Sequence, residues 1–487
     1  MPIKNLSISF LFLLLFSNFG ASQIKVIDDI KLNKHYDLSV YEDNNIALLY
    51  TSKKQAGNAS FNLLKLDHQL NIVENNPIIL GGNYRLTASL TNQAATLSIF
   101  YEKDLVRNIY MVSKGGNTFM LHSDSYFYNT RRFKTIIRAG ENHETFYIIK
   151  QVKNNNTFML SKLHLTEGLL WETRLMGRKK NGSDVRVEDG FHLGNKIVIV
   201  QGDNAYSRKV NFSMEFFNTS NGEKSHSIPL NNDDIVKSVD LIKIDQLNNR
   251  MLMAGRYQPG NRLKQQQTIS FYLSEYDLNG ALIHEKISFG NEIDNYLVGW
   301  QDAIFDEDGN IKLLGERFTN TSDAEKIGMS ILTAAITGGA FSAYTGTFKV
   351  REIILIDFNQ ELDIIETNVI PFQKTTMVNA HTDEYRTLEF ARRVGMFRYR
   401  GVLDNQLAIF AIGDAFAMVD LNTATVNPAW FKAPDNTEFL SFLKDWKYPV
   451  QWDEEGAVFY KKTDRNVLSF EYKYYKDLPR MNVEMRP

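Results

Sequence analysis

The feature that most constrains the fold of this chain is a pattern that recurs about every 50 residues. Each copy contains an apolar run, a variable loop, a second apolar run and a turn rich in Asp, Asn and Gly. Two clear copies are residues 251–257 with 269–280, and residues 311–318 with 352–359. Self-similarity at a fixed period is typical of repeat architectures, in which every unit forms one small block of secondary structure.

The first apolar runs begin at eight nearly evenly spaced positions. They start near residues 46, 96, 145, 196, 250, 311, 406 and 457, so that one interval is 95 residues and the others lie between 49 and 61. A period near 50 with paired strands matches one four-stranded blade of a β-propeller. We therefore predict an all-β chain, a β-propeller of eight four-stranded blades, with seven blades as the alternative count.

The other two strands of each predicted blade flank the paired apolar runs. Inner strands are expected at residues 36–41, 84–90, 133–138, 185–193, 236–244, 296–305, 394–403 and 448–452. Outer strands such as 281–289 and 364–372 mix charged and apolar residues, as solvent-facing edges should. The run 24–32 has outer-strand character without an inner partner, so we expect it to close the ring by pairing into the last blade.

Two or three β-sandwich domains are the alternative architecture, because their short strands also recur closely along the chain. A sandwich has no reason to repeat at about 50 residues, so the propeller is favoured. The chain contains no cysteine, which excludes disulfides, thiolate zinc sites and iron–sulfur clusters. A net charge of −2 argues against a nucleic-acid-binding protein, which normally carries a basic excess.

The first 22 residues have the pattern of a secretory signal. Lys4 precedes a nine-residue apolar core at 8–16, and small residues at 17–22 offer a cleavage site after Ser22. The core is too short to span a bilayer of about 30 Å, and no cysteine is present for lipid attachment. We expect one propeller domain over residues 23–487 that is secreted, periplasmic or at the cell surface, and is not a lipoprotein.

The interval of 95 residues contains an insertion at about 319–349. From Ile327 to Phe348 there is no charge, and small residues recur every four positions at Ser330, Ala334 and Gly338. This spacing lets helices approach closely, whereas the pair Gly338-Gly339 is equally typical of a hairpin turn. We expect an insertion packed on the propeller face or lengthened strands of one blade, with membrane or partner contact as the alternative. Residues 375–393 are expected to form a loop excursion with a short helix near 383–393.

Common catalytic motifs are absent from the sequence. No two of the nine histidines stand four residues apart, and neither a G-x-S-x-G elbow nor a P-loop occurs. Asp306-x-Asp308-x-Asn310 has the opening of a calcium loop, but Ile311 and Arg317 stand where that loop needs Gly and a bidentate acid. We expect a strand-connecting turn there, and neither a metal nor a cofactor.

One turn resembles a motif of a known family. Thr166-Glu-Gly-Leu-Leu-Trp171 is similar to the blade-closing T-G-x-x-x-W turn of pyrroloquinoline-quinone-type propellers, although Glu167 replaces the first Gly and the motif occurs once. In that family the Trp packs between neighbouring blades, which the resemblance implies for Trp171. The resemblance is to secreted β-propellers as an architecture, over most of the mature chain, and it does not imply the quinone.

Arginines are the strongest candidates for ligand contacts. Five of them lie within fifteen residues, at Arg386, Arg392, Arg393, Arg398 and Arg400. Guanidinium groups hold carboxylate, sulfate or phosphate in a bidentate manner, whereas Glu384 and Glu389 favour ordinary surface ion pairs. In the inner strands, the polar residues expected at the mouth of the central channel are Arg85, Arg186, Asp302 and Arg400, a placement that depends on strand register.

The predicted function is therefore binding rather than catalysis. We expect an exported, non-catalytic propeller that binds a protein, a peptide or an anionic glycan on one face of the ring, with Arg85, Arg186, Asp302, Arg398 and Arg400 as candidate contacts. The alternative is a glycan hydrolase or lyase with its site at the propeller axis, because propellers assemble sites from residues far apart in sequence.

Overall fold

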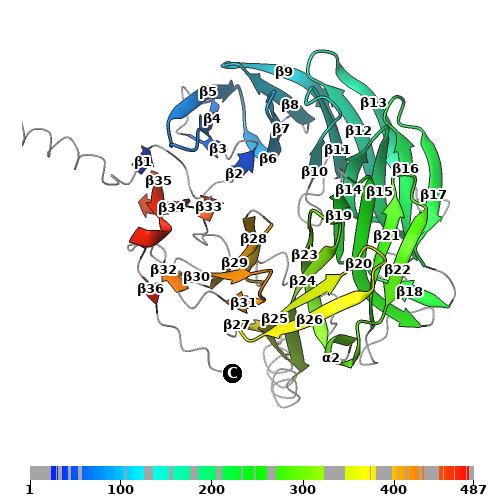
Figure 1. The fold of residues 1–487 in the computed structure, drawn as a ribbon. Coiled ribbons are helices and arrows are strands. Elements are labelled where there is room, and N and C mark those ends of the chain that lie inside the picture. Colours follow the sequence, from blue (N-terminus) through cyan, green and yellow to red (C-terminus); the bar gives the residue numbers. More distant parts are fainter. Residues whose placement is uncertain are drawn as a thin grey trace, which may run out of the picture.

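The protein forms a ring of antiparallel sheets in the computed structural model (Figure 1). The structure describes residues 24–28, 30, 36–41, 45–52, 58–103, 105, 107–125, 135–152, 157–175, 185–203, 211–231, 234–245, 248–259, 270–294, 296–322, 346–372, 375–379, 397–403, 405–412, 415–426, 430–432, 449–452, 455–464, 467–478 and 480–481. Each sheet is one blade, and the blades follow one another around the ring in sequence order.

The first four blades are regular four-stranded meanders. Blade 1 consists of β2 (Asp37–Tyr41), β3 (Asn45–Thr51), β4 (Ala59–Leu66) and β5 (Ile72–Leu80). Blade 2 consists of β6 (Tyr84–Thr91), β7 (Thr96–Glu102), β8 (Arg107–Lys114) and β9 (Asn117–Asp124). Blade 3 consists of β10 (Ile136–Ala139), β11 (Thr145–Val152), β12 (Thr157–His164) and β13 (Gly168–Leu175). Blade 4 consists of β14 (Val185–Leu193), β15 (Lys196–Asp203), β16 (Asn211–Asn218) and β17 (Lys224–Pro229).

The other four blades carry additional strands or borrow one. Blade 5 consists of β18 (Ile235–Lys237), β19 (Leu241–Asp245), β20 (Arg250–Pro259), β21 (Ser270–Asp277) and β22 (Leu282–Ile287), followed by α2 (Asn291–Asp294). Blade 6 consists of β23 (Leu297–Phe305), β24 (Ile311–Ser322), β25 (Gly346–Phe358), β26 (Ile364–Ile370) and β27 (Thr375–Asn379). Blade 7 consists of β28 (Tyr399–Leu403), β29 (Leu407–Ile412), β30 (Ala415–Asp420), β31 (Thr425–Val426) and β32 (Trp430–Lys432). Blade 8 consists of β33 (Pro449–Trp452), β34 (Gly456–Asp464) and β35 (Val467–Tyr474), and η1 (Tyr475–Asp477) follows it.

Both ends of the described chain pair with the last two blades. The N-terminal β1 (Ile24–Ile27) lies against β35 as the outer strand of blade 8, with Ile24 opposite Glu471 and Ile27 opposite Leu468. The C-terminal β36 (Arg480–Met481) pairs with β32 of blade 7. The predictions of eight blades and of ring closure by the N-terminal run are confirmed. The pairing of β36 was not predicted, because a two-residue strand leaves no periodic signal.

The middle strands are apolar on both faces because each blade packs between two others. On β11, Phe146 and Ile148 lie in the core between blades 2 and 3, whereas Tyr147 and Ile149 lie in the core between blades 3 and 4. The described residues form eight such clusters, one for each blade interface, including the two interfaces of blade 8. The short apolar runs of the sequence are therefore strands covered on both sides.

A β-bulge recurs in the innermost strands. The register shifts by one residue in β6, β14, β23, β28 and β33, which leaves these residues as the extra ones: Thr87, Glu188, Gln301, Arg400 and Val450. A bulge bends the strand and changes the direction of the side chains beside it. The repeated bulge gives Asp189 and Asp302 the same position, directly after the extra residue of their strands.

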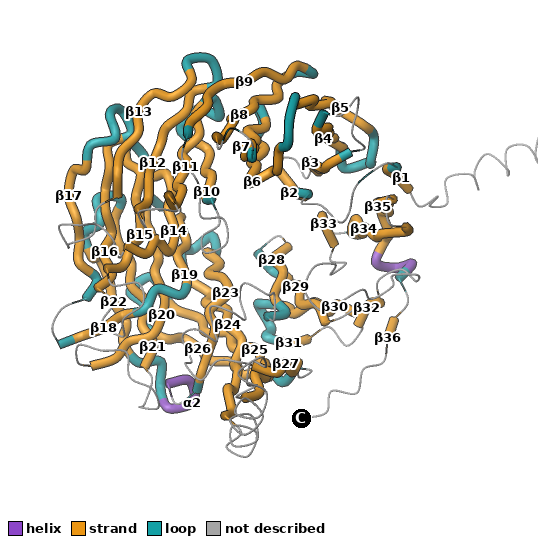
Figure 2. The backbone as a smooth tube through the Cα atoms, turned by 180° about the vertical axis from the view of Figure 1, so that it is seen from behind, coloured by secondary structure: helices purple, strands orange, loops and turns teal. Residues whose placement is uncertain are grey.

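The two faces of the ring carry different connections. Turns between the first and second strands and between the third and fourth strands are short, and Figure 2 shows them as brief teal segments at the strand ends. We call this side the short-turn face. On it, Asp306 accepts the amide hydrogen of Asn310 at 2.8 Å, and Asp67 and Asp277 close equivalent turns. This confirms that Asp306–Asn310 is a strand-connecting turn.

The opposite side is the long-connection face, where second strands lead to third strands and each blade leads to the next. Blade 6 is lengthened on this side, because β24 and β25 extend until Ser322 stands opposite Gly346. The flanks of the predicted insertion are therefore lengthened strands, and residues 323–345 lie outside the described ones. Residues 375–379 were predicted as loop, which is wrong: they form β27, because the extension of β25 offers them a partner.

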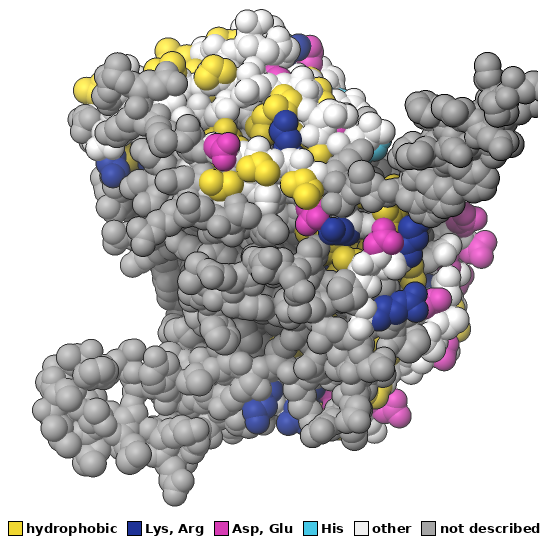
Figure 3. Space-filling view, turned by 90° about the vertical axis from the view of Figure 1, so that its left-hand side faces the viewer, with side chains coloured by type: hydrophobic (Ala, Val, Ile, Leu, Met, Phe, Trp, Pro, Cys, Tyr) yellow, Lys and Arg dark blue, Asp and Glu magenta, His cyan; other side chains and the backbone are white. Residues whose placement is uncertain are grey.

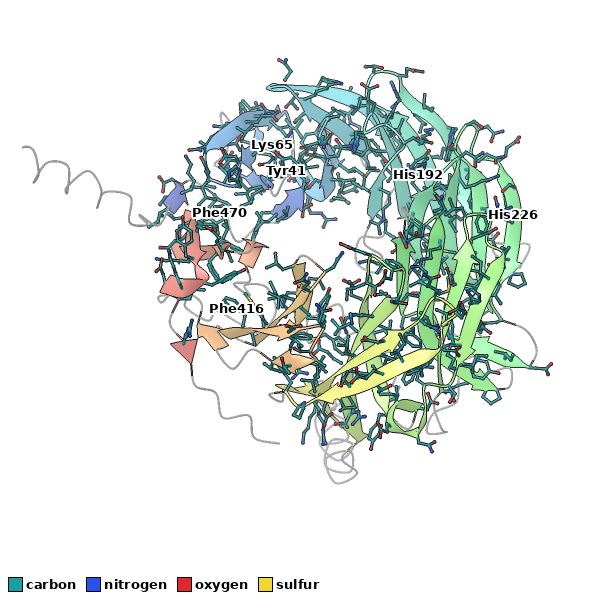
Figure 4. All side chains as sticks on the ribbon, viewed as in Figure 1. Tyr41, Lys65, His192, His226, Phe416 and Phe470 are labelled. Atoms are coloured by element: carbon teal, nitrogen blue, oxygen red, sulfur yellow. The ribbon has the colours of Figure 1, made fainter. Side chains whose placement is uncertain are left out.

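Trp171 lies between blades 3 and 4, as the resemblance implies. Its indole Nε1 donates a hydrogen bond to the carbonyl oxygen of Thr219 at 3.0 Å. A Cβ atom at Gly222 would lie 2.4 Å from the indole ring, and Gly222 has φ +71°, so the contact requires glycine. His226 of β17 (labelled in Figure 4) makes the corresponding contact with blade 5 by donating a hydrogen bond to the carbonyl oxygen of Asn279.

On the side seen in Figure 3, acidic and basic side chains are interspersed with apolar ones, in keeping with the net charge of −2. Among the described residues, no helix is long and apolar enough to cross a membrane.

Candidate binding site at the propeller axis

The three arginines expected at the channel mouth have their backbone positions on one side of the ring. Arg85, Arg186 and Arg400 are each the second residue of an innermost strand, β6, β14 and β28. Innermost strands begin on the long-connection face, so the three backbone positions lie at the same end of the axis (Figure 1). Arg85 and Arg186 also share one register position, two residues before the bulge.

The surroundings of the three guanidinium groups differ. Arg85 is exposed. Arg400 is partly buried and donates hydrogen bonds to the carbonyl oxygens of Phe397 at 2.6 Å and Tyr399 at 2.7 Å. The side chain of Arg186 lies outside the described ones. Ligand binding by these residues stays a prediction.

Asp302 links three blades near the axis. One of its carboxylate oxygens accepts a hydrogen bond from Lys243 Nζ of β19 at 2.7 Å and from the amide of Ala303 at 2.8 Å. Its other oxygen accepts the hydroxyl hydrogen of Tyr399 of β28. The carboxylate therefore connects the innermost strands of blades 5, 6 and 7.

Asp189 repeats this arrangement two blades earlier. Its carboxylate accepts hydrogen bonds from Arg138 Nη2 of β10 at 2.6 Å and from the amide of Gly190 at 2.7 Å. Lys243 lies two residue pairs before the end of its hairpin, and Arg138 has the same position when the hydrogen-bonded pair Gly140–Thr145 is counted as the end of its hairpin. Arg138, Asp189 and Lys243 were not predicted as site residues, although their common place in the repeat was a signal that could have identified them.

The negative charges of Asp189 and Asp302 are thus balanced by a basic side chain of the preceding blade. Ser89 adds a further link, because its hydroxyl donates to Asp37 of blade 1 at 2.6 Å. Burial, reinforced by the negative charge of Asp302, raises the pKa of Tyr399 well above its ordinary value. Tyr399 therefore remains a neutral hydrogen-bond donor at physiological pH, which suits a structural link better than proton abstraction.

Arg398, which was expected to contact an anionic ligand, lies in the interior. Its Nε donates to Glu316 Oε2 of β24 at 2.6 Å, and the two side chains are 1% and 0% exposed. Its Nη2 donates to the carbonyl oxygen of Arg351 at 2.8 Å, and its guanidinium stacks over Phe372. The anion held by Arg398 is thus Glu316 of the same chain, which favours a structural role. Arg386, Arg392, Arg393, Glu384 and Glu389 lie outside the described residues.

A second cluster of titratable groups joins blades 3 and 4 near the short-turn face. Glu141 accepts hydrogen bonds from the hydroxyl of Tyr147 at 2.7 Å and from Lys162 Nζ at 3.3 Å. The imidazole of His192 (labelled in Figure 4) stacks on Tyr147, and burial lowers the pKa of His192. Burial alone would raise the pKa of Glu141, but the Tyr147 hydrogen bond and the charges of Lys162 and His192 lower it to about 2.

This cluster predicts a pH-dependent contribution to stability. The pKa of Glu141 is lower in the folded chain than its usual value of 4.5, so its contribution is complete above about pH 4.5 and disappears as pH falls toward 2. We expect Glu141→Gln to lower the melting temperature most at pH 6–7, with a difference from wild type that shrinks below about pH 4.5. Thermal melts across this range measure the difference, and the exposed Glu167→Gln is the control. A difference that is constant with pH would contradict the assignment.

Among the described residues, no group of three or more His, Asp or Glu side chains is arranged to hold a metal ion. No family model matches the chain, and no curated protein sequence matches it.

Solved structures share the fold at low identity. The chain is similar to the quinohemoprotein alcohol dehydrogenase from Pseudomonas putida, with a TM-score of 0.40 and 11% identity over 100% of this chain and 80% of that one. It is similar to BamB from Moraxella catarrhalis, with a TM-score of 0.32 and 10% identity over 93% of this chain and 99% of that one. The β-propeller domain of the Trilobed protease from Pyrococcus furiosus aligns with a TM-score of 0.38 and 11% identity over 84% of this chain and 100% of that domain. These similarities concern the fold alone.

Proposed function

We propose that this chain is an exported, non-catalytic β-propeller that binds an anionic glycan over the axis of its long-connection face. The observation that supports this is the placement of Arg85, Arg186 and Arg400 at the start of three innermost strands, at the same end of the axis. Guanidinium groups match the fork of a carboxylate or sulfate, and acidic glycans carry such groups at regular intervals.

The links among the innermost strands support binding over catalysis. A glycosidase needs two carboxylates free to act as acid and as base or nucleophile. Asp189 and Asp302 instead hold Arg138 and Lys243 of the preceding blades and the amides next to them in sequence. These contacts hold neighbouring blades together, which is a structural role.

Export through residues 1–22 belongs to this proposal, because an extracellular or periplasmic location is where a glycan-binding propeller meets polysaccharides. Contact of the segment Ile327 to Phe348 with a membrane or a partner stays a prediction, since most of that segment lies outside the described residues.

Titration of polygalacturonate, a polymer of carboxylated sugars, into the purified protein tests the proposal. We expect saturable binding that weakens with added salt, and a loss of at least about tenfold in affinity in the Arg85→Ala/Arg400→Ala variant, because charge-assisted hydrogen bonds are lost. The matched control is Lys114→Ala, which removes an exposed positive charge next to a short turn. Equal affinity in the two variants would contradict the site. Preference for polyglutamate over polygalacturonate would replace the glycan with an acidic peptide.

The same titration tests the enzyme alternative. New reducing ends or unsaturated products would contradict the non-catalytic assignment. If Asp302→Asn abolished that activity while binding remained, the axis would contain a catalytic carboxylate.

A further inference from the structure

A buried lysine between blades 2 and 3 faces two carboxylates. Lys150 Nζ of β11 lies 3.0 Å from Asp124 Oδ2 of β9 and 2.8 Å from Glu172 Oε2 of β13. The exposed fractions of the three side chains are 1%, 8% and 15%. The site therefore joins the outer strand of one blade to the second strand of the next. Its three charged side chains are largely shielded from solvent.

Further hydrogen bonds fix both carboxylates. The hydroxyl of Tyr110 donates to Asp124 Oδ2 at 2.6 Å, and Asn108 Nδ2 donates to Asp124 Oδ1 at 2.8 Å. Ser161 Oγ donates to Glu172 Oε2 at 2.8 Å. Tyr110 and Asn108 are themselves buried, so the orientation of the Asp124 carboxyl group relative to the Lys150 nitrogen is held by β8.

A buried amine and two carboxyl groups meet at one point in this site. Amide formation needs an unprotonated amine and a carboxylic acid, and a proton can pass between these groups because they lie within hydrogen-bond distance. Moving the Lys150 proton to a carboxylate produces a neutral amine beside a neutral carboxylic acid. These two groups, held about 3 Å apart, are the reactants of amide formation.

We propose that Lys150 and Asp124 form an intramolecular isopeptide bond, with Glu172 as the proton carrier. The Nζ lone pair attacks Cγ of protonated Asp124, and the charge that develops on Oδ1 is stabilised by the Asn108 amide. Glu172 accepts a proton from Nζ and delivers it to Oδ2, which leaves as water while the Nζ–Cγ bond remains. The amine and the acid give an amide and one water, nothing is oxidised or reduced, and Glu172 returns to its initial form.

A similar ion pair in blade 1 provides a comparison. Lys65 Nζ of β4 lies 2.8 Å from Glu74 of β5, and both side chains are nearly buried beside Tyr41 (Figure 4). Among the described residues, Glu74 is the carboxylate paired with Lys65, so no second acid is present to move the proton. We expect Lys65 to remain a free amine.

Peptide mapping by mass spectrometry tests the bond in the purified full chain. Trypsin should yield one branched peptide that joins residues 115–131 to residues 139–153, uncut after Lys150. Its mass should equal the sum of the two linear peptides less one water, about 18 Da. Linear peptides 115–131 and 139–150 in the wild-type chain, each at full mass, would overturn the proposal.

Three variants separate the reaction from a structural role. Lys150→Arg keeps the positive charge and should give only linear peptides, and Glu172→Gln should lose at least about 90% of the branched product because the proton carrier is absent. Asp124→Asn should reach the same branched mass as wild type, because an amide group leaves as ammonia instead of water. Lys65→Arg is the control and should leave the branched peptide intact. A branched peptide that persists in Lys150→Arg would contradict the assignment.

Discussion

Replacing Glu316 with alanine is expected to lower the free energy of unfolding by about 3–5 kcal/mol, because it leaves the buried guanidinium of Arg398 without its counter-ion. Glu316 Oε1 also accepts the backbone amides of Arg398 at 2.8 Å and Tyr399 at 2.9 Å. The substitution therefore removes three hydrogen bonds at the entrance to β28, where both side chains of the ion pair are inaccessible to water.

Urea denaturation followed by tryptophan fluorescence measures this loss. The control is Glu361→Ala, an exposed glutamate in the turn between β25 and β26, which should change the free energy of unfolding by less than about 0.5 kcal/mol. A loss below about 1 kcal/mol for Glu316→Ala would show that the Arg398 ion pair is not buried as described.

Removing β1 is the second large effect that we expect. A chain that begins after Ile27 should lose at least about 3 kcal/mol, because Ile27 leaves the core between blades 8 and 1 and β35 becomes an open edge. The comparison is with a chain that begins at residue 23, measured by the same denaturation and by the rate of proteolysis within blade 8. Equal stability of the two chains would contradict ring closure by β1.

A pair of cysteines gives a positive test of the same closure. Val26 and Ser469 stand opposite each other in the β1–β35 ladder, and the natural chain has no cysteine to compete. Val26→Cys/Ser469→Cys should form an intramolecular disulfide and raise the melting temperature, since the bridge constrains the unfolded chain. The single variants are the controls, and a double variant that stays reduced under oxidising conditions would argue against this register.

The fold was predictable because its information is local and periodic. Apolar runs such as those of β11 and β12 predict the hairpins, and the repeat near 50 residues groups the hairpins into blades. Residues 236–244 were predicted as one inner strand, but the structure divides this stretch into β18 and β19, which both pair with β20. The division lies beside Gly255 of β20, where a Cβ atom would lie 1.9 Å from the carbonyl oxygen of Ser238, and such a contact between distant residues leaves no local pattern.

The candidate site was predictable only in part. Arg85, Arg186 and Arg400 could be placed near the axis because they begin predicted inner strands. Arg398 is two residues from Arg400, but its partner Glu316 is 82 residues away, so no local pattern could show that it turns inward. The links of Asp189 and Asp302 depend on the recurring bulge, which shifts each carboxylate toward the preceding blade and leaves no mark in composition.

We propose above all that one end of the propeller axis binds an anionic glycan through arginines of different blades. A crystal structure of the protein with a galacturonate oligomer tests this proposal most directly. We predict that the sugar carboxylates contact Arg85 and Arg400 over the axis on the long-connection face. An oligomer bound on the short-turn face or along the outer strands, with Arg85 and Arg400 untouched, would contradict the claim.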